Sequence, residues 1–453
     1  MQWLLLVGVL VGCQGGVEIP AGPTTSLALP DATATSQPLP ATQPPPTSEP
    51  TTDVTPNPPD PVPVTATAEI AATAPVVAQG QPLRRQLLSS YTFPDALSIA
   101  ASLAADGTLY IAVGQDNYLY VARSTDGGVT FADLVQVSES QPAMVLPVER
   151  PAIAATAAGQ VAVAWSSPDL QGRIWQAFSL DGGQSFSPAV ALSQSSATET
   201  ILPRMILDES QNPLVAWLAN SSLRLARSAD GGASYGAEQL LDEQTCECCH
   251  PQPLVLGEQI FVAYRNLEIA ADGANIRDIY LIRSVDGGQS FAPETRISDA
   301  NWYVNACPVS GPSLVGAGNR LYVSWMDGRN DAQGNFSQTD IWLATSTDGG
   351  ATFSANWRVN QQDGYHNLPE LALDETGTLH IAWVARETER AVVYYARSLD
   401  QGQTFSEPLA IVDSREGNGP PGSSSLLAAP DGTLYLTWVD FAGAHVRSWQ
   451  VTD

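Results

Sequence analysis

Lysine is missing from this sequence, and all twenty basic residues are arginine. Against them stand 47 acidic residues, which leaves a formal net charge of −27 at pH 7. A chain with this imbalance repels the phosphates of nucleic acids and the anionic headgroups of membranes. We therefore expect no nucleic-acid partner, and the few arginines become the cationic positions to locate.

Long hydrophobic runs are also scarce. After residue 80 no apolar run approaches the roughly 20 residues that a membrane-spanning helix needs. The N-terminal run from Trp3 to Gly12 is shorter still and is followed by Cys13. This end resembles a bacterial lipoprotein signal, in which cleavage before the cysteine frees it for lipid attachment. No Lys or Arg precedes the run, so an ordinary secretory signal is the alternative.

The next segment, residues 17 to about 80, is rich in Pro, Thr, Ala and Ser and has no aromatic residues. Such a segment cannot bury enough apolar surface to offset its ordering entropy. We expect three parts: a signal peptide (1–12), a disordered tether (13–82) that begins at a lipid-bearing Cys13, and a globular head (83–453). This layout predicts a protein held on the outside of the cell membrane and displayed on the cell surface, touching the membrane only through its lipid.

One pattern recurs six times in the head, at intervals of 49 to 62 residues. The six copies are STDGGVTF from Ser124, SLDGGQSF from Ser179, SADGGASY from Ser228, SVDGGQSF from Ser284, STDGGATF from Ser346 and SLDQGQTF from Ser398. This spacing is typical of the blades of a β-propeller. Within each copy the Asp can accept turn amides, and Gly supplies positive φ.

A second pattern lies between these copies and alternates with period two, as in LYVSW from Leu321. Alternation of this kind predicts a buried strand. Its equivalent aromatic positions, which we expect in the core, are Trp165, Trp217, Tyr264, Trp325, Trp383 and Trp438.

The six-fold pattern resembles the Asp-box, or bacterial neuraminidase repeat, of sialidase-like β-propellers, and the resemblance covers residues 83–453. It implies that each box lies on the hairpin between the third and fourth strands of a blade, away from the ligand-binding face. The box aspartates would then be structural rather than catalytic: Asp126, Asp181, Asp230, Asp286, Asp348 and Asp400.

Seven innermost strands can be counted, near Leu97, Ile153, Met205, Leu254, Leu314, Leu371 and Leu426. The last unit has only three strands, so we expect the segment from Arg84 to complete it and close the ring. The predicted fold is an all-β, seven-bladed propeller of four-stranded antiparallel blades. Sialidases of this superfamily have six blades, so the seven blades expected here differ from the sialidase pattern.

Arginines gather on the face opposite the boxes. The segments LPRMIL from Leu202 and LPELAL from Leu368 place Arg204 and Glu370 at equivalent positions of two blades, facing the central channel. Because the planar guanidinium suits a carboxylate, Arg150, Arg204 and Arg277 are predicted ligand-binding residues. Local ion pairs that stabilise loops are the alternative.

Sialidases grip the sialic carboxylate with three arginines and use a Tyr–Glu nucleophile with an acid/base Asp. No nucleophilic tyrosine can be assigned here. Other glycosidases need only two carboxyl groups at a suitable separation, and Glu370, Asp278 and Asp327 are the candidates. No cofactor is implied.

Four cysteines remain in the head: Cys246, Cys248 and Cys249 in TCECCHPQP, and Cys307 in the corresponding loop one blade on. In an oxidising compartment we expect one disulfide from the cluster to Cys307 and a second within the loop, with a vicinal Cys248–Cys249 bridge as one option. The rival is a Zn or Cu site formed by these thiolates and His250.

Three classes of function follow. The first is a monomeric, surface-anchored exo-glycosidase acting on extracellular acidic glycans, with a glycan or other small acidic molecule as ligand. The second is a non-catalytic binding or assembly propeller. The third is a metal-binding protein that uses the cysteine loop. The same fold can host all three.

Overall fold

The computed structural model describes residues 83–168, 172–194, 199–331, 337–415 and 421–452. Across these ranges the backbone forms strands, turns and loops without a helix, and so contains no helix long and apolar enough to cross a bilayer. The predicted signal peptide, Cys13 and the tether lie outside the described residues and stay predictions.

Seven four-stranded antiparallel sheets follow one another along the chain, each numbered outward from an inner strand. Blade one consists of β2 (Ser98–Leu103), β3 (Leu109–Gln115), β4 (Tyr118–Ser124) and β5 (Val135–Gln136). Blade two consists of β6 (Ala152–Ala155), β7 (Val161–Ser166), β8 (Ile174–Ser179) and β9 (Val190–Ala191). Blade three consists of β10 (Thr200–Leu207), β11 (Pro213–Ala219), β12 (Ser222–Arg227) and β13 (Gln239–Asp242). Blades four and five are β14 (Gln252–Leu256), β15 (Gln259–Arg265), β18 (Ile279–Ser284) and β19 (Thr295–Arg296); and β20 (Ser313–Ala317), β21 (Arg320–Asp327), β22 (Asp340–Ser346) and β23 (Trp357–Arg358). Blade six is β24 (Tyr365–Leu373), β25 (Leu379–Arg386), β26 (Ala391–Ser398) and β27 (Leu409–Asp413).

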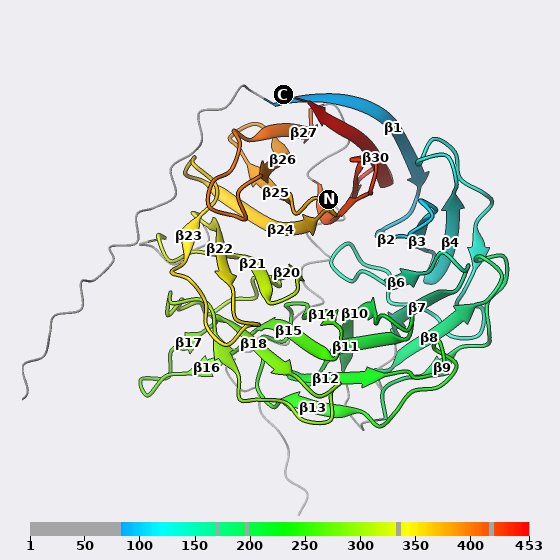
Figure 1. Ribbon diagram of the computed structural model, residues 1–453, viewed down its shortest axis with the longest axis horizontal. Helices are drawn as coiled ribbons and strands as arrows, with labels where there is room; N and C mark the ends of the chain where they lie inside the picture. The colour runs from blue at the N-terminus through cyan, green and yellow to red at the C-terminus, as the bar shows by residue number, and fades with distance from the viewer. Residues whose placement is uncertain (1–82, 169–171, 195–198, 332–336, 416–420, 453) are drawn as a thin grey trace, which may run out of the picture. The chain divides into compact units, whose positions relative to one another are not determined.

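The seventh blade contains strands from both ends of the head. Its order is β28 (Gly422–Ala428), β29 (Leu434–Asp440), β30 (Gly443–Thr452) and β1 (Arg84–Pro94). In the β1–β30 ladder Tyr91 lies opposite Val446, and Figure 1 shows the first strand (blue) beside the last (red). The predicted seven blades and their closure by the segment from Arg84 are therefore confirmed.

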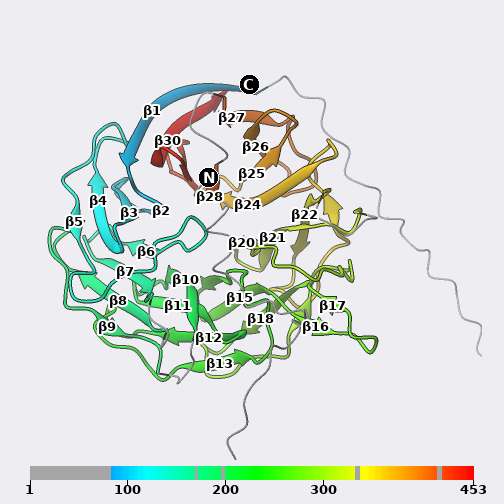
Figure 2. The same ribbon diagram turned by 180° about the vertical axis from the view of Figure 1, so that it is seen from behind.

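The inner strands surround the centre of the ring, as the labels β2, β6, β10, β20, β24 and β28 show in Figure 2. The core lies in and between the blades. Each of the six aromatic residues expected in the core is at most 4% exposed. Strands that are buried on both faces need apolar residues at nearly every position, which explains the pattern of the second repeat.

The box hairpins connect third to fourth strands, as expected. In the box after β8, Asp181 Oδ1 accepts hydrogen bonds from Ser179 Oγ (2.7 Å) and the Ser185 amide (2.9 Å). Gly182 and Gly183 take φ values of 75° and 77°, which side chains disfavour. The carboxylate thus ties the turn to the end of the strand.

Antiparallel connections alternate between the two ends of each blade. Since the boxes occupy one end, the loops from second to third strands and from each outer strand to the next inner strand share the other. We call this end the loop face. Blade four carries an extra hairpin there, β16 (Glu268–Ile269) paired with β17 (Asn275–Ile276), between β15 and β18.

Candidate functional site

Two inner strands, β10 and β24, share the same irregularity. Leu202 and Leu368 have φ values of 58° and 52°, and each is followed by proline and a shift of register. Beyond the shift Arg204 lies opposite Ala216 and Glu370 opposite Ala382, the residues that precede the core tryptophans. The sequence correctly placed Arg204 and Glu370 at equivalent positions of blades three and six.

The bulge in β10 is held by a carboxyl from the neighbouring blade. Glu149 accepts hydrogen bonds from the Leu202 amide (2.8 Å) and from the Ser166 hydroxyl. Burial raises the pKa of Glu149 to about 7, although these two hydrogen bonds and the charge of Arg204 oppose the rise. Glu149 therefore positions the turn that carries Arg204.

Arg150 connects blades that are not neighbours in the ring. It comes from the loop before β6 in blade two, yet its Nη2 donates to Glu370 Oε1 of blade six (2.9 Å) and its Nη1 to Ser425 Oγ of blade seven (3.0 Å). A side chain can reach both partners only across the centre of the ring. The contacts therefore locate Arg150, Glu370 and Ser425 at the axis.

Arg204 is 8% exposed, and part of its guanidinium group has no partner. Nη1 donates to the Pro203 carbonyl (2.9 Å), whereas Nε and Nη2 are buried without a hydrogen bond. Burial lowers the pKa of Arg204, as does the charge of Arg150, against the opposing effect of Glu370 and Glu149. Nε and Nη2 form the side of the fork that binds a carboxylate through two parallel hydrogen bonds.

His250 lies beside the two arginines. Burial lowers its pKa well below the usual range, and the charges of Arg204 and Arg150 lower it further, so the ring is neutral. Its Nδ1 is buried without a partner. A Cβ at Gly311 would lie 2.7 Å from this nitrogen and 2.0 Å from the His250 carbonyl oxygen, so this close approach requires glycine.

We call Arg150, Arg204, His250, Glu370 and Ser425 the axial cluster. The sequence placed Arg150, Arg204 and Glu370 on one face but did not assign Ser425 or Glu149 to the site, and it considered His250 only as a metal ligand. The three residues that the sequence did not assign to this cluster, Glu149, His250 and Ser425, each lie next to or within an inner strand. That position is the sequence signal from which they could have been predicted.

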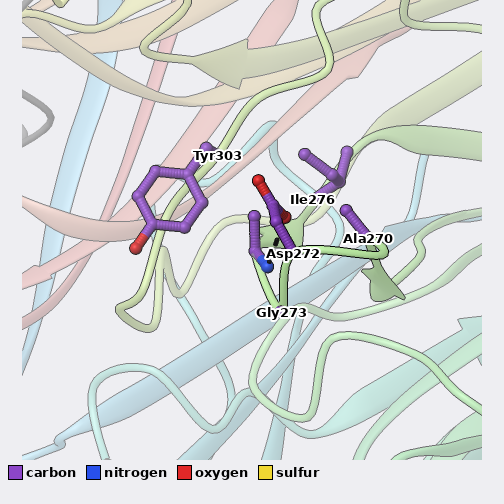
Figure 3. Close-up of a pocket in the computed structure, with 6 residues that line it drawn as sticks. Ala270, Asp272, Gly273, Ile276 and Tyr303 are labelled. Atoms are coloured by element: carbon purple, nitrogen blue, oxygen red, sulfur yellow. Dashed lines mark hydrogen bonds between the residues drawn. The ribbon is translucent and has the colours of Figure 1, made fainter.

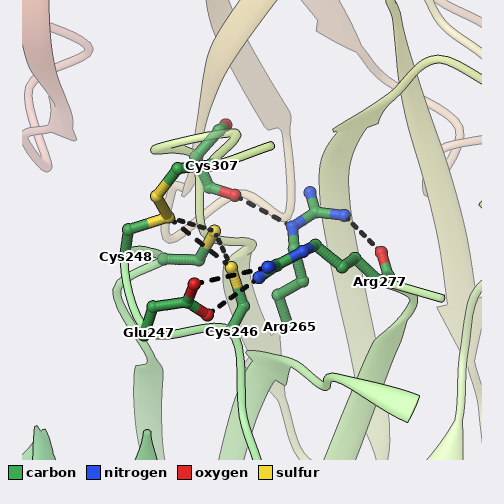
Figure 4. Close-up of a disulfide and its surroundings, with 8 residues drawn as sticks. Cys246, Glu247, Cys248, Arg265, Arg277 and Cys307 are labelled. Carbon is green, nitrogen blue, oxygen red and sulfur yellow. Dashed lines mark hydrogen bonds and ion pairs between the residues drawn. A yellow bond between two sulfur atoms is a disulfide. The ribbon is translucent and has the colours of Figure 1, made fainter. Parts of the chain in front are cut away.

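Arg277, the third predicted ligand arginine, follows β17 at the end of the extra hairpin and pairs with Glu247 of the cysteine loop instead of joining the axial cluster. Its Nη1 and Nη2 donate to the two carboxylate oxygens of Glu247, at 3.0 and 3.3 Å (Figure 4). It is 3% exposed. Burial would lower the pKa of Arg277, but Cys246 and Glu247 outweigh it and raise the pKa.

A disulfide joins Cys248 to Cys307 and so connects the loops that precede β14 and β20 of adjacent blades (Figure 4). This confirms the expected bridge from the cluster to Cys307, and it rules out the vicinal Cys248–Cys249 option in this structure because Cys248 already has a partner. The second disulfide expected within the loop is not formed in this structure: with Cys248 bonded to Cys307, Cys246 and Cys249 are buried free cysteines whose sulfurs lie 2.7 Å apart. Burial opposes ionisation of Cys249, but the hydrogen bond from Cys246 and the charge of Arg265 lower its pKa to about 7.

Two of the three candidate catalytic carboxylates hold loops. Asp278, 2% exposed, accepts hydrogen bonds from the Asn301 amide (3.0 Å) and pairs with Arg296. Asp327, 1% exposed, accepts from Trp325 Nε1 (2.8 Å) and pairs with Arg329 (2.7 Å). In the described part of the chain these partners lie outside the axial cluster, so the catalytic role of both aspartates stays a prediction.

The loop face also has a peripheral hollow beside the extra hairpin of blade four (Figure 3). Its volume is about 510 Å³, and it is lined by Ala270, Asp272, Gly273, Ala274, Ile276 and Tyr303. Tyr303 is 54% exposed, and the neighbouring Trp302 carbonyl accepts a hydrogen bond from the Arg277 amide. The hollow thus lies next to Arg277, whose side chain pairs with Glu247, and it presents the Tyr303 ring near the Asp272 carboxylate (Figure 3).

No protein-family model matches this chain, and no curated protein has a similar sequence. Solved structures do share its fold. An ulvan lyase, described as a new family of polysaccharide lyase, superposes with a TM-score of 0.54 at 11% identity over 81% of this chain and 96% of its own. An α-L-arabinofuranosidase from Fusarium graminearum superposes with a TM-score of 0.47 at 13% identity, over 81% of this chain and 98% of its own. A Hadza microbial sialidase superposes with a TM-score of 0.42 at 16% identity, over 77% of this chain and 73% of its own. At these identities the likeness to the lyase establishes the fold alone.

Proposed function

We propose that the chain is a carbohydrate-active propeller that binds the acid group of an acidic saccharide at the axial cluster. The observation that carries the proposal is the unpaired edge of Arg204. Two buried donors without an acceptor are costly, and a carboxylate would satisfy both with charge-assisted hydrogen bonds.

The charges of the cluster favour an anion. Glu370 pairs with Arg150 at 2.9 Å and neutralises it, which leaves Arg204 without an ion pair of its own among the described residues. Glu149, with a pKa of about 7, offsets that charge only partly near neutral pH. A monoanionic group would complete the balance, on a protein whose net charge of −27 repels anions elsewhere.

The small exposure of Arg150 and Arg204, 7% and 8%, limits what can enter. Only the acid group of a ligand would reach them, and the rest of the saccharide would lie on the loop face. Tyr303 offers an exposed ring there on which a sugar could stack. The predicted leader and Cys13 would place this face outside the cell, where acidic polysaccharides are met.

Binding is better supported than turnover, because Asp278 and Asp327 are each paired with an arginine. Exo-glycosidase action remains a second candidate, since Glu370 lies within the cluster and could act on a bound sugar. Its carboxylate would have to leave Arg150 or act while paired with it. Release of reducing sugar from each bound oligosaccharide tests this candidate separately.

The test is calorimetric binding of oligosaccharides that end in glucuronic or N-acetylneuraminic acid. A structural neighbour of this chain, an ulvan lyase, was solved bound to -[GlcA(1-4)Rha3S]-, so glucuronate-containing oligosaccharides are the first to screen. We expect Arg204→Met to weaken binding by about 100-fold, since losing two hydrogen bonds to a charged group costs roughly 3 kcal/mol. Methyl esterification of the ligand should have the same effect.

The matched control is Arg224→Met in the same blade. Arg224 lies away from the axis, where its Nη1 pairs with Glu238 Oε1 at 3.0 Å. Losing this ion pair should change the affinity for the saccharide by no more than about two-fold. Thermal melting should show both variants folded. If Arg204→Met binds the acid and its ester as well as the wild type does, the axial cluster is not the binding site.

A further inference from the structure

Four cysteines pack together in what we call the cysteine centre: Cys246, Cys248, Cys249 and Cys307. It adjoins the axial cluster, because His250 directly follows Cys249 in the chain. Figure 4 labels Cys246, Cys248 and Cys307. Cys246, Cys248 and Cys249 are at most 7% exposed, and Cys307 packs against them from the next blade. The sulfurs of Cys246, Cys248 and Cys249 all lie within 4.8 Å of one another. Water is thus largely excluded from a compact set of soft ligands.

Two of the sulfur separations match those of a metal thiolate. Cys248 Sγ lies 3.8 Å from Cys246 Sγ and 4.0 Å from Cys249 Sγ. A tetrahedron of sulfurs bonded to Zn²⁺ at about 2.3 Å has edges of about 3.8 Å. The third separation, 2.7 Å between Cys246 and Cys249, would have to widen by about 1 Å.

The buried positive charges of Arg265 and Arg277 beside the cysteine centre favour thiolates over neutral sulfur. Arg265 is 1% exposed, and its three described hydrogen bonds all go to backbone carbonyls, those of Ser310, Arg277 and Met326. None of these partners neutralises its charge. Arg277, paired with Glu247, adds a second buried guanidinium group beside the sulfurs. Two disulfides would be neutral and would leave Arg265 without an anion, whereas a metal thiolate would supply one.

The three carbonyls also fix the position of Arg265. They come from the loop before β20, the end of the extra hairpin and strand β21, and the guanidinium lies 5.1 Å from the centre of the Trp302 ring. The positive charge is therefore in place before any ion binds. Such preorganised surroundings are typical of metal sites in proteins.

We infer that, once the Cys248–Cys307 disulfide is reduced, the four thiolates of the cysteine centre bind one thiophilic d¹⁰ cation, Zn²⁺ or Cu⁺. The reductant is a dithiol. It gives two electrons and two protons, the bond between Cys248 and Cys307 breaks to two thiols, and the reductant becomes a disulfide. Metal binding then displaces the thiol protons, and a zinc tetrathiolate would carry two negative charges opposite Arg265 and Arg277. The disulfide form is the metal-free state.

The test uses the full chain with Cys13→Ser, so that every thiol counted belongs to the centre. Protein reduced with a dithiol and freed of it under nitrogen is titrated with Co²⁺ as a spectroscopic probe for Zn²⁺, and with Cu⁺ against a chromogenic chelator. We expect one ion per chain, with thiolate charge-transfer absorption for Co²⁺. Cys246→Ser and Cys249→Ser should each lower the affinity at least 100-fold, because each removes one of four ligands.

Wild-type protein in detergent is the matched control, since it differs only at Cys13 and should bind the same single ion. Unfolding of a serine variant would show as a lost melting transition, and Cys307→Ser provides a second variant with a ligand removed from the other loop. Four titratable thiols with no bound ion would overturn the inference. So would an ion that survives both Cys246→Ser and Cys249→Ser.

Discussion

Glu149→Gln should remove a pH dependence of stability that one buried carboxyl creates. Glu149 is 4% exposed and accepts the Leu202 amide and the Ser166 hydroxyl. Burial raises its pKa from 4.5 to about 7. Because the folded-state value is the higher one, the folded protein holds this proton more tightly than the unfolded chain. The stabilising contribution is therefore complete below about pH 4.5 and is lost as the pH rises through about 7.

The size of the effect follows from the shift. A difference of about 2.5 pKa units corresponds to about 3 kcal/mol in the free energy of unfolding. Glutamine does not titrate, and its amide oxygen can still accept the Leu202 amide. Relative to the wild type, Glu149→Gln should thus gain up to about 3 kcal/mol between about pH 5 and pH 9.

Urea denaturation at a series of pH values measures this difference through the midpoint and slope of each curve. Glu139→Gln is the control, because Glu139 is an exposed residue of the same connection between blades one and two. Its stability curve should run parallel to that of the wild type. If the Glu149→Gln curve also runs parallel from about pH 5 to pH 9, Glu149 is not a buried carboxyl with a raised pKa.

Three further predictions concern the scaffold. Deleting residues 17–80 should leave the melting temperature nearly unchanged, whereas deleting residues 17–90 should lower it sharply by removing most of the β1–β30 ladder; equal melting of the two would contradict ring closure. Trp217→Ala should cost about 3–5 kcal/mol in chemical denaturation, because this fully buried side chain would leave a cavity. Hydrogen bonds from Thr130 lower the pKa of Asp126 from 3.8 to about 2. The ionised carboxylate therefore stabilises the fold above about pH 4, and this stabilisation is lost as the pH falls toward 2. In Asp126→Asn the melting temperature should depend less on pH across that range.

The sequence alone determined the number of blades and the way the ring closes. Both follow from local information: a box at each third-to-fourth strand turn, a period-two strand between the boxes, and one strand too few at the C-terminal end. The equivalence of Arg204 and Glu370 was also readable, because Leu-Pro precedes each of them at the same place in the repeat. Likewise, the sequence showed that loops of adjacent blades on one face could bring Cys307 to the other cysteines.

Only the tertiary structure decided which side chains meet. Arg150 and Glu370 are 220 residues apart and pair across the ring, and no repeat spacing contains that contact. The same holds for Arg277, which pairs with Glu247 rather than joining the axial cluster, and for Cys248 as the partner of Cys307. The physical reason is that a blade is specified by contacts between neighbouring strands, whereas the axis and the loop face depend on the direction of single long side chains, and those are set by bulges and partners from several blades at once.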